Sequence, residues 1–290
     1  IVYASNFLIF EVYPALVMAR RCGAKLVVKI QNLLHSQSGR PTFFDRLFLT
    51  SEKWSMRLAC RHADLIMCLS QPVKTDFCKL ATQLNLKWSG PEVVGCGLDF
   101  TELDNTPTEN TEFDLVLLGR IHEQKGVFDL PDVWGLIIQK RPESRMVVIG
   151  EGPHRKMLMK TMEERGLAHS ITFTGGIPEE EKNKFLRQSK LGLSLSFEEG
   201  WGLSVTEFLA AGLPVVAYDL PVFRELFSEV LHFIPLKSKS LAAEAILSLL
   251  DHPEDLKSSG LKGMHHARQF NYQEVANQEL SLMKKLIQSQ

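Results

Sequence analysis

The sequence predicts an α/β protein built from two doubly wound parallel sheets. Short apolar runs rich in β-branched residues alternate with longer amphipathic segments, which is the order that successive βαβ units produce. The alternation is broken once, between Leu98 and Phe113, by a polar, Thr-rich and acidic stretch without periodicity. We therefore expect two domains joined by a linker at residues 99–112, and a length of 290 residues is enough for both.

The first expected domain covers residues 1–98. Its apolar runs predict strands, and its amphipathic segments predict helices. The expected strands are 1–3, 26–30, 65–69 and 93–94. The expected helices are 14–22, 44–62 and one that begins near Pro72, with Gly23 and Ser70 as caps.

The second expected domain covers residues 113–270 and shows the same alternation more completely. The expected strands are 115–118, 146–149, 171–173, 191–195, 215–217 and 232–234. The helices between them are expected at 131–140, 155–165, 179–188, 203–211 and 241–250. Two further helical patterns, 256–269 and 272–287, complete the chain.

The composition argues against several classes of protein. A formal net charge of −1 provides no basic field, so we expect no nucleic-acid partner. The five cysteines form no CxxC pair and no Cys/His ligand spacing, which indicates reduced thiols in a cytoplasmic protein. No segment has the length and apolar character of a membrane span. Because Ile1-Val2-Tyr3 reads as a strand with no Met before it, we expect a fragment that lacks an N-terminal portion.

The stretch 197–207 combines a strand end, a glycine-bearing turn and a helix start. Glu198 and Glu199 end the strand, and the helix begins after Gly202. The unpaired N–H groups and the positive dipole end of such a helix suit an anion. Glu207 is a lone carboxylate on this apolar helix, so it either pairs within the protein or accepts hydroxyl protons from a polar ligand.

Two cations, Arg120 and Lys125, follow the expected strand 115–118, and each stands beside a glycine. Ligands of open α/β sheets bind outside the carboxyl ends of the strands. Arg can bind two oxygens at once and Lys acts as a point charge, so the pair suits a diphosphate; the alternative is two solvated surface cations. Glycines also end the next two strands, at Gly150 and at Gly175-Gly176, and together they would clear room for a ligand.

In order and spacing, four motifs resemble the retaining glycosyltransferases of the GT-B fold, the glycogen-synthase-like family-four group (glycosyl transferases group 1). The motifs are Gly119-Arg120 with Lys125-Gly126, Gly150-Glu151-Gly152-Pro153, Phe173-Thr174-Gly175, and Glu199 through Glu207 to Gly212-Leu213-Pro214. The resemblance covers about residues 113–219 and is looser before the linker. It implies two Rossmann-like domains, the N-terminal one incomplete, and a closing helix in residues 271–290 that crosses back to the first domain.

The resemblance also implies a role for each motif. Arg120 and Lys125 would bind the diphosphate of a nucleotide sugar and stabilise it as it leaves, and Glu199 would hold hydroxyls of the donor sugar. These three are the expected catalytic residues, and Glu207 would bind the ribose. The remaining expected contacts are Gly200, Trp201, Gly202 and Leu203 for sugar and phosphate, Gly175, Gly176 and Ile177 for the base, and Gly150 beside them. Such a transfer needs no metal ion and no cofactor besides the nucleotide-sugar co-substrate.

Two departures from the family pattern concern the first domain. Members usually have a His at the end of the strand that corresponds to residues 26–30, and this chain has Gln31 there. Gln can hydrogen-bond a sugar hydroxyl but cannot exchange a proton near neutral pH, so either another group such as His35 fills the role or turnover is weakened. The family's glycine-rich loop near the start is also missing, which fits the loss of about 60–90 residues, or two to three βαβ units.

We therefore expect a hexosyltransferase that moves a sugar from a nucleoside-diphosphate sugar to a hydroxyl group of a glycan, lipid-linked or small-molecule acceptor, with retention of configuration. A nucleotide-sugar epimerase of similar architecture is one alternative. A module that binds the donor without catalysis is another, and Gln31 and the missing N-terminal portion favour it.

The segment 43–57 mixes aromatic residues with cations, including Lys53, Trp54 and Arg57. It is either an interfacial patch for a lipid-linked acceptor or the core face and solvated charges of one helix. The first alternative would place the protein peripherally on the inner face of a membrane.

Overall fold

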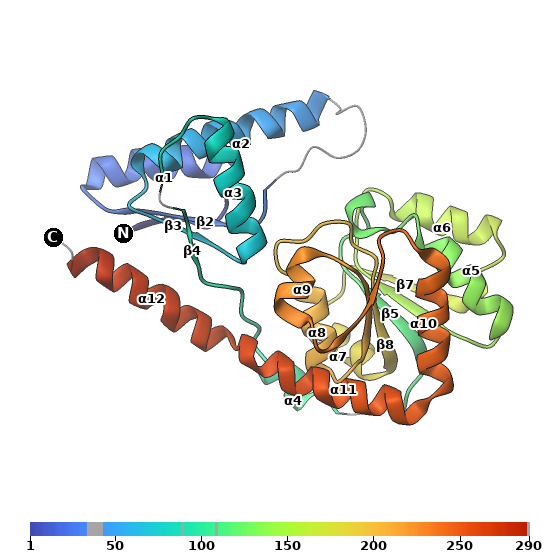
Figure 1. Cartoon of the computed structure of the whole chain (residues 1–290). Coiled ribbons are helices and arrows are strands. Elements are labelled where there is room, and N and C mark those ends of the chain that lie inside the picture. Colours follow the sequence, from blue (N-terminus) through green and yellow to red (C-terminus); the bar gives the residue numbers. More distant parts are fainter. Residues whose placement is uncertain (34–42, 89, 108–109, 289–290) are drawn as a thin grey trace. The chain divides into compact units, whose positions relative to one another are not determined.

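The computed structural model describes residues 1–33, 43–88, 90–107 and 110–288, without the side chains of residues 43–45. These residues form two compact units (Figure 1), one of Ile1–Gly97 with Tyr272–Gln290 and the other of Leu98–Asn271. Each unit contains a parallel sheet with helices packed on it, so the predicted α/β class is confirmed.

The first unit is built on a four-stranded parallel sheet of order β1-β2-β3-β4. Its strands are β1 (Val2–Ala4), β2 (Leu26–Ile30), β3 (Leu65–Cys68) and β4 (Glu92–Val93). Its helices are α1 (Ile9–Cys22), α2 (Phe43–His62), α3 (Gln71–Gln83) and α12 (Tyr272–Gln288). The sequence prediction began α1 at Pro14, but Pro14 lies inside the helix and Ile9 begins it.

Helices cover both faces of this sheet. Val28 and Ile66 face the cluster that includes Leu16 of α1, Met56 of α2 and Phe77 of α3. Their neighbours point the other way, because side chains alternate along a strand. Val27 and Met67 pack against Leu282, Met283 and Leu286, which places α12 on this second face (Figure 1).

The second unit contains a six-stranded parallel sheet of order β10-β9-β8-β5-β6-β7. The strands are β5 (Phe113–Leu118), β6 (Met146–Ile149), β7 (Ile171–Gly175), β8 (Ser189–Ser194), β9 (Val215–Tyr218) and β10 (Leu231–Ile234). From β5 the chain proceeds outward to β6 and β7, then returns to place β8 on the other side of β5. The strand order therefore reverses between β5 and β8, which is where open α/β sheets bind ligands.

The helices of this unit are again divided between the two faces of the sheet. The bounds are α4 (Thr101–Asn105), α5 (Leu130–Lys140), α6 (Arg155–Glu164), α7 (Glu179–Arg187), α8 (Leu203–Ala210), α9 (Pro221–Phe227), α10 (Lys239–Asp251) and α11 (Pro253–Ala267). Short 3₁₀ turns lie at Glu123–Lys125, Ala168–Ser170 and Arg268–Phe270.

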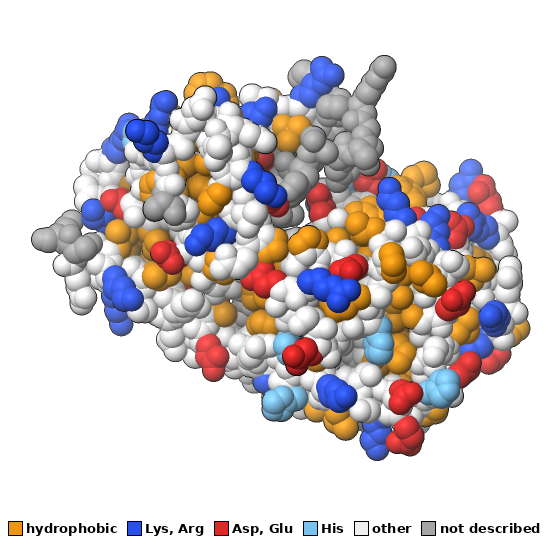
Figure 2. Space-filling model, viewed as in Figure 1, with side chains coloured by type: hydrophobic (Ala, Val, Ile, Leu, Met, Phe, Trp, Pro, Cys, Tyr) orange, Lys and Arg blue, Asp and Glu red, His pale blue; other side chains and the backbone are white. Residues whose placement is uncertain are grey.

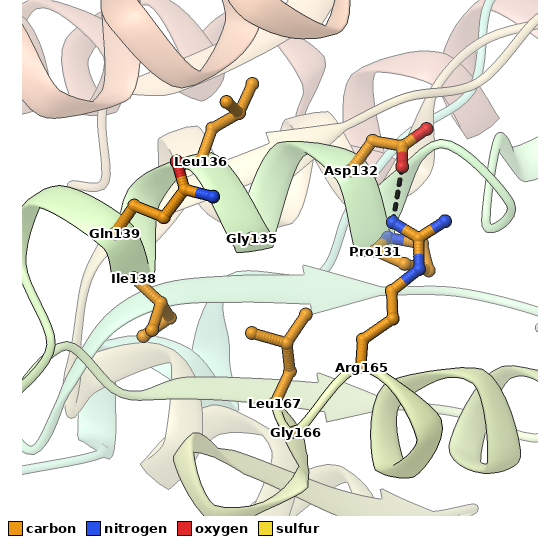
Figure 3. A pocket seen from close by; sticks show the side chains of 9 residues that line it. All are labelled: Pro131, Asp132, Gly135, Leu136, Ile138, Gln139, Arg165, Gly166 and Leu167. Carbon is orange, nitrogen blue, oxygen red and sulfur yellow. Dashed lines mark hydrogen bonds and ion pairs between the residues drawn. The ribbon is translucent and has the colours of Figure 1, made fainter.

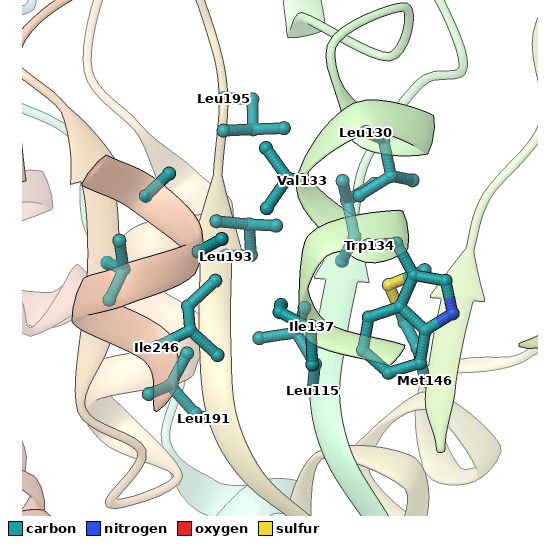
Figure 4. Packing of buried hydrophobic residues seen from close by; sticks show 14 of the residues in the cluster. Leu115, Leu130, Val133, Trp134, Ile137, Met146, Leu191, Leu193, Leu195 and Ile246 are labelled. Atoms are coloured by element: carbon teal, nitrogen blue, oxygen red, sulfur yellow. The ribbon is translucent and has the colours of Figure 1, made fainter. Parts of the chain in front are cut away.

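The main core lies between this sheet and helices α5 and α10 (Figure 4). Leu191 and Leu193 of β8 pack there with Trp134 of α5 and Ile246 of α10. Gly192 points to the opposite face, where a Cβ atom would lie 2.6 Å from the ring of Phe208. This glycine therefore allows α8 to lie close on the sheet, which positions the stretch that carries the strongest motif.

The expected linker is partly helical. Residues 101–105 form α4, and Phe100 and Leu103 are buried in the second unit. The Arg187 guanidinium donates a 3.0 Å hydrogen bond to the Leu103 carbonyl, and Arg268 pairs with the Asp104 carboxylate. The sequence analysis did not predict this helix, because only two apolar side chains, three positions apart, anchor its single turn.

Candidate functional site

The loops after β5 and β8 meet at the point where the strand order reverses. The Phe197 amide donates a 2.8 Å hydrogen bond to the Gln124 carbonyl, which joins the two loops. Gly126 has a φ of 64°, and a Cβ atom there would lie 1.9 Å from the Leu195 carbonyl oxygen. Only glycine combines this backbone conformation with so close an approach.

Lys125 and Glu199, which are 74 residues apart in sequence, form an ion pair across these loops. The Ser196 hydroxyl donates a second hydrogen bond to the same Glu199 oxygen, at 2.9 Å. The Glu199 side chain is 11% exposed and that of Lys125 is 28% exposed, so both are largely shielded from solvent. The sequence analysis placed these residues in one site, and the structure brings their side chains into contact.

Arg120 belongs to a hydrogen-bonded chain that also crosses both loops. Its guanidinium donates to the Gln124 side-chain oxygen at 3.1 Å, and the Gln124 amide donates to the Glu198 carboxylate at 2.6 Å. Arg120 itself is exposed, and Gln124 takes one of its five donors. Gln124 is thus a residue that the sequence analysis missed; its position between the two predicted cations is the signal that could have found it.

The N-terminus of α8 points its backbone N–H groups toward the same edge of the sheet. Gly202 precedes the helix with a φ of 108°, and no side chain caps the first turn. Trp201 is buried and meets the Phe270 ring edge-on, with ring centroids 5.2 Å apart. Trp201 therefore holds the loop by packing. Of its neighbours in the predicted site, Gly200 is buried and Leu203 is exposed.

Glu207 lies in the second turn of α8 and forms an ion pair with Lys182 of α7, which also pairs with Glu179. Burial raises the pKa of Glu207, and the Lys182 ammonium acts against that rise. For Lys182, burial opposes the charged form, but the carboxylates of Glu207 and Glu179 outweigh it and raise its pKa. We infer a charged pair, because each partner supplies the field that the other needs.

Lys182 is a second residue that the sequence analysis missed. Its side chain lies on the buried face of α7, three and four residues before Phe185 and Leu186. A Lys at helical spacing from apolar residues is the signal that could have identified it.

The glycines at the ends of β5, β6 and β7 tie these strand ends together. The Gly119 amide donates to the Ile149 carbonyl at 3.0 Å, and the Gly150 amide donates to the Gly175 carbonyl at 2.9 Å. A Cβ atom on Gly150 would lie 2.0 Å from the Gly119 carbonyl oxygen. Glycine is therefore needed at this position to let the two backbone segments pack closely. Gly176 is exposed and Ile177 half-buried at the outer end of this row.

The other expected site residues lie in the first unit or outside the described chain. Gln31 follows β2, is exposed, and donates a 3.1 Å hydrogen bond from its side-chain amide to the Ser5 carbonyl. His35 lies outside the described residues. In the ranges that the structure describes, no three His, Cys, Asp or Glu side chains gather as a metal site.

Helix α2 exposes apolar side chains that the core-face alternative would bury. Trp54 is 56% exposed, and Leu47 and Phe48 are exposed as well, so that alternative is wrong for these three. The Arg57 guanidinium lies over the Trp54 ring, 5.8 Å from its centroid. No helix within the described ranges has the length and apolar character needed to span a membrane.

Outside the predicted site, the described part of the chain shows charged side chains of both signs and a groove. On the face seen in Figure 2, Lys and Arg side chains are interspersed with Asp and Glu. A groove of about 550 Å³ lies between α5 and the end of α6 (Figure 3), beside the ion pair of Asp132 and Arg165. Its lining includes Leu136, Gln139 and Leu167 and none of the predicted site residues.

Known proteins with related sequences include glycosyltransferases. The alpha-D-kanosaminyltransferase of Streptomyces kanamyceticus is 25% identical over 259 residues, which are 83% of this chain and 65% of that protein. The alpha-monoglucosyldiacylglycerol synthase of Acholeplasma laidlawii is 26% identical over 53% of this chain and 38% of its own length. The chain thus spans less than two thirds of these relatives.

Solved structures show the same fold. Sucrose-phosphate synthase from Thermosynechococcus elongatus has a TM-score of 0.78 at 18% identity, covering 98% of this chain and 73% of that protein. Anabaena HepE in complex with UDP and glucose has a TM-score of 0.79 at 17% identity, covering 95% of this chain and 76% of that protein. These likenesses confirm the expected GT-B fold.

The family comparison agrees with the motifs. The family model of glycosyl transferases group 1 matches residues 99–263, which is more than half of the chain and includes the whole β5–β8 site. The chain therefore belongs to the glycosyl transferases group 1 family.

Proposed function

We propose that this chain transfers a hexosyl group from a nucleoside-diphosphate sugar to a hydroxyl acceptor, with retention of configuration and without a metal ion. The observation that carries the proposal is the convergence at the β5–β8 edge. There Lys125 contacts Glu199, Arg120 is linked to Glu198 through Gln124, and the uncapped N-terminus of α8 faces the same edge. Cations and a helix dipole beside a carboxylate suit a ligand that combines phosphates with a sugar.

The diphosphate would be held by Arg120, Lys125 and the backbone N–H groups of Gly202 and Leu203. Negative charge develops on the diphosphate as the sugar leaves, so donors placed at that point stabilise the transition state more than the ground state. In this proposal the two cations supply the positive charge that a divalent ion would otherwise provide.

The sugar and the nucleoside would take the remaining polar groups. We assign the donor-sugar hydroxyls to Glu199, supported by the Gly200 and Trp201 backbone, and the ribose hydroxyls to Glu207. The base would lie against Gly175, Gly176 and Ile177, beside Gly150. Several solved proteins of this fold contain UDP, which makes UDP the first nucleotide to test.

For the acceptor, we favour a lipid-linked hydroxyl over a glycan or a small molecule. Phe10 and Tyr13 of α1 and Phe48 and Trp54 of α2 are exposed, and Arg57 lies over the Trp54 ring. Exposed aromatic side chains together with cations suit the interface of an anionic membrane. The names of two relatives refer to lipids that carry sugars: the alpha-monoglucosyldiacylglycerol synthase and a phosphatidyl-myo-inositol mannosyltransferase. Peripheral membrane contact is part of this proposal.

A second candidate is a module that binds the donor but does not transfer the sugar. Gln31 favours it, because its amide cannot exchange a proton and is engaged with the Ser5 carbonyl. The family assignment favours the transferase over an epimerase.

Two measurements separate the candidates. A thermal-shift panel of UDP-, GDP- and ADP-sugars should raise the melting temperature with the correct donor, since a ligand that binds only the folded state stabilises it. The donor that binds is then incubated with the protein and alcohol or lipid acceptors, and the product is analysed by NMR for its anomeric configuration. Binding without transfer or hydrolysis would support the inactive module, and binding of no nucleotide sugar would refute both candidates.

A further inference from the structure

Lys182 is the one cation among the buried residues of the described chain, and the family motifs assign it no role. It is 9% exposed, and its ammonium contacts the carboxylates of Glu207 and Glu179. The other Lys of α7, Lys184, pairs with the exposed Glu180 at 2.8 Å and is only half-buried. A buried ammonium is costly unless carboxylates accompany it, so the position of Lys182 calls for a specific explanation.

The place of Lys182 in the fold supplies that explanation. Helix α7 begins at Glu179, separated by one residue from Gly175, Gly176 and Ile177, the loop assigned to the base. Its fourth residue, Lys182, reaches across to α8 and contacts Glu207, the residue assigned to the ribose. Lys182 thus connects the two parts of the proposed nucleoside site.

The contact leaves Glu207 able to bind a ligand. Lys182 donates to one carboxylate oxygen, Oε1, and an ionised carboxylate offers about four acceptor positions on its two oxygens. If Glu207 were protonated, one oxygen would become a donor and the group would accept fewer hydroxyl protons. Burial favours that protonated form, and the Lys182 ammonium opposes it.

We propose that Lys182 is a positioning residue that holds Glu207 as an oriented carboxylate for the two ribose hydroxyls of the donor nucleotide. This inference rests on the proposed function, because it assumes that Glu207 faces the ribose. Lys182 and Glu179 are the charged groups whose fields act on Glu207. Helix α11 and strands β8 and β9 also pack against α8, and they add no such charge among the described residues.

The test is calorimetric titration of UDP into the wild-type chain and the variants Lys182→Met, Glu207→Gln and the double variant, between about pH 6 and about pH 9. We expect Lys182→Met to bind UDP at least about tenfold more weakly near neutral pH and to recover affinity about tenfold per pH unit as Glu207 ionises. Lys184→Met is the matched control on the same helix and should bind as the wild type does.

Three results would overturn the inference. One is equal UDP affinity of the wild type and Lys182→Met at every pH. Another is an undiminished effect of Lys182→Met in the Glu207→Gln background, which would mean that Lys182 acts directly on the nucleotide or only on folding. The third is that Lys182→Met weakens the binding of 2′,3′-dideoxyuridine diphosphate, which lacks both ribose hydroxyls, as much as it weakens the binding of UDP.

Misfolding is separated from the proposed effect by Lys182→Arg, which keeps the charge and should retain binding without the new pH dependence. A loss in Lys182→Arg equal to that in Lys182→Met would overturn the inference. Failure of the wild type to bind UDP, GDP or ADP would refute the proposed function and this inference with it, whereas the differences among variants test the inference alone.

Discussion

Lys125 provides the most direct test of the site. Replacing it with Ala removes the proposed diphosphate cation. The Glu199 carboxylate also loses its ion pair and keeps the hydrogen bond from the Ser196 hydroxyl. A hydrogen bond to a charged group contributes about 1.5–3 kcal/mol, and about 1.4 kcal/mol corresponds to a tenfold change in affinity. We therefore expect Lys125→Ala to bind UDP about 10- to 100-fold more weakly, as measured by calorimetric titration.

The alternative is that Lys125 only neutralises Glu199, and a double-mutant cycle distinguishes the two roles. UDP carries the diphosphate but no donor sugar, so Glu199→Gln should change UDP affinity little while weakening the binding of a UDP-sugar. If Lys125 contacts the diphosphate, Lys125→Ala should weaken UDP binding by the same factor in the Glu199→Gln background as in the wild type.

The matched control is Lys160→Ala, which removes a solvent-exposed Lys that pairs with Glu164 on the outer surface of α6. Such exposed pairs contribute at most about 1 kcal/mol, and this one lies outside the proposed site. Unchanged UDP affinity in Lys125→Ala, or an effect that disappears when Glu199 is Gln, would refute the reasoning.

The remaining predictions concern stability and membrane binding. Gly126→Ala should lower the free energy of unfolding by about 2–4 kcal/mol in urea titrations, because Gly126 has a positive φ and lies against the Leu195 carbonyl. Gly166 has a φ of 71° but open space around it, so Gly166→Ala should lower the free energy of unfolding by only about 1 kcal/mol. Equal losses in the two variants would contradict the steric argument. Trp54→Ser should reduce cosedimentation with anionic vesicles severalfold without lowering stability, and undiminished sedimentation would exclude α2 as the contact. The hydrogen bonds from Arg268 hold the pKa of Asp104 below its usual value, so Asp104→Asn should cost about 0.5 kcal/mol above pH 4, where the unfolded carboxyl is ionised. That difference should vanish as the pH falls through the lower folded pKa, and a difference that persisted in acid would rule out the charge as its cause.

Most of the fold was predictable because its signals are local. Strand β2 is apolar except for Lys29, as expected for a parallel strand covered on both faces, and α5 shows helical periodicity. The short helix α4 was missed because only Phe100 and Leu103 mark it, within a stretch of Thr, Asp and Glu. The exposed Trp54 shows a related limit: periodicity identifies an apolar residue on a helix but does not show whether another element covers it.

The sequence by itself determined the alternation of strands and helices and the motifs that distinguish this family, because both depend on residues within one turn, strand or helix. The tertiary structure decided which side chains meet. Lys125 reaches Glu199 because β8 lies beside β5 in the sheet, and Lys182 reaches Glu207 because α7 and α8 are brought together over 25 residues of chain. Sheet order and helix packing arise from the burial of the whole core, so no local spacing specifies these contacts, and the residues that hold Glu207 and Arg120 in place became evident only in the folded chain.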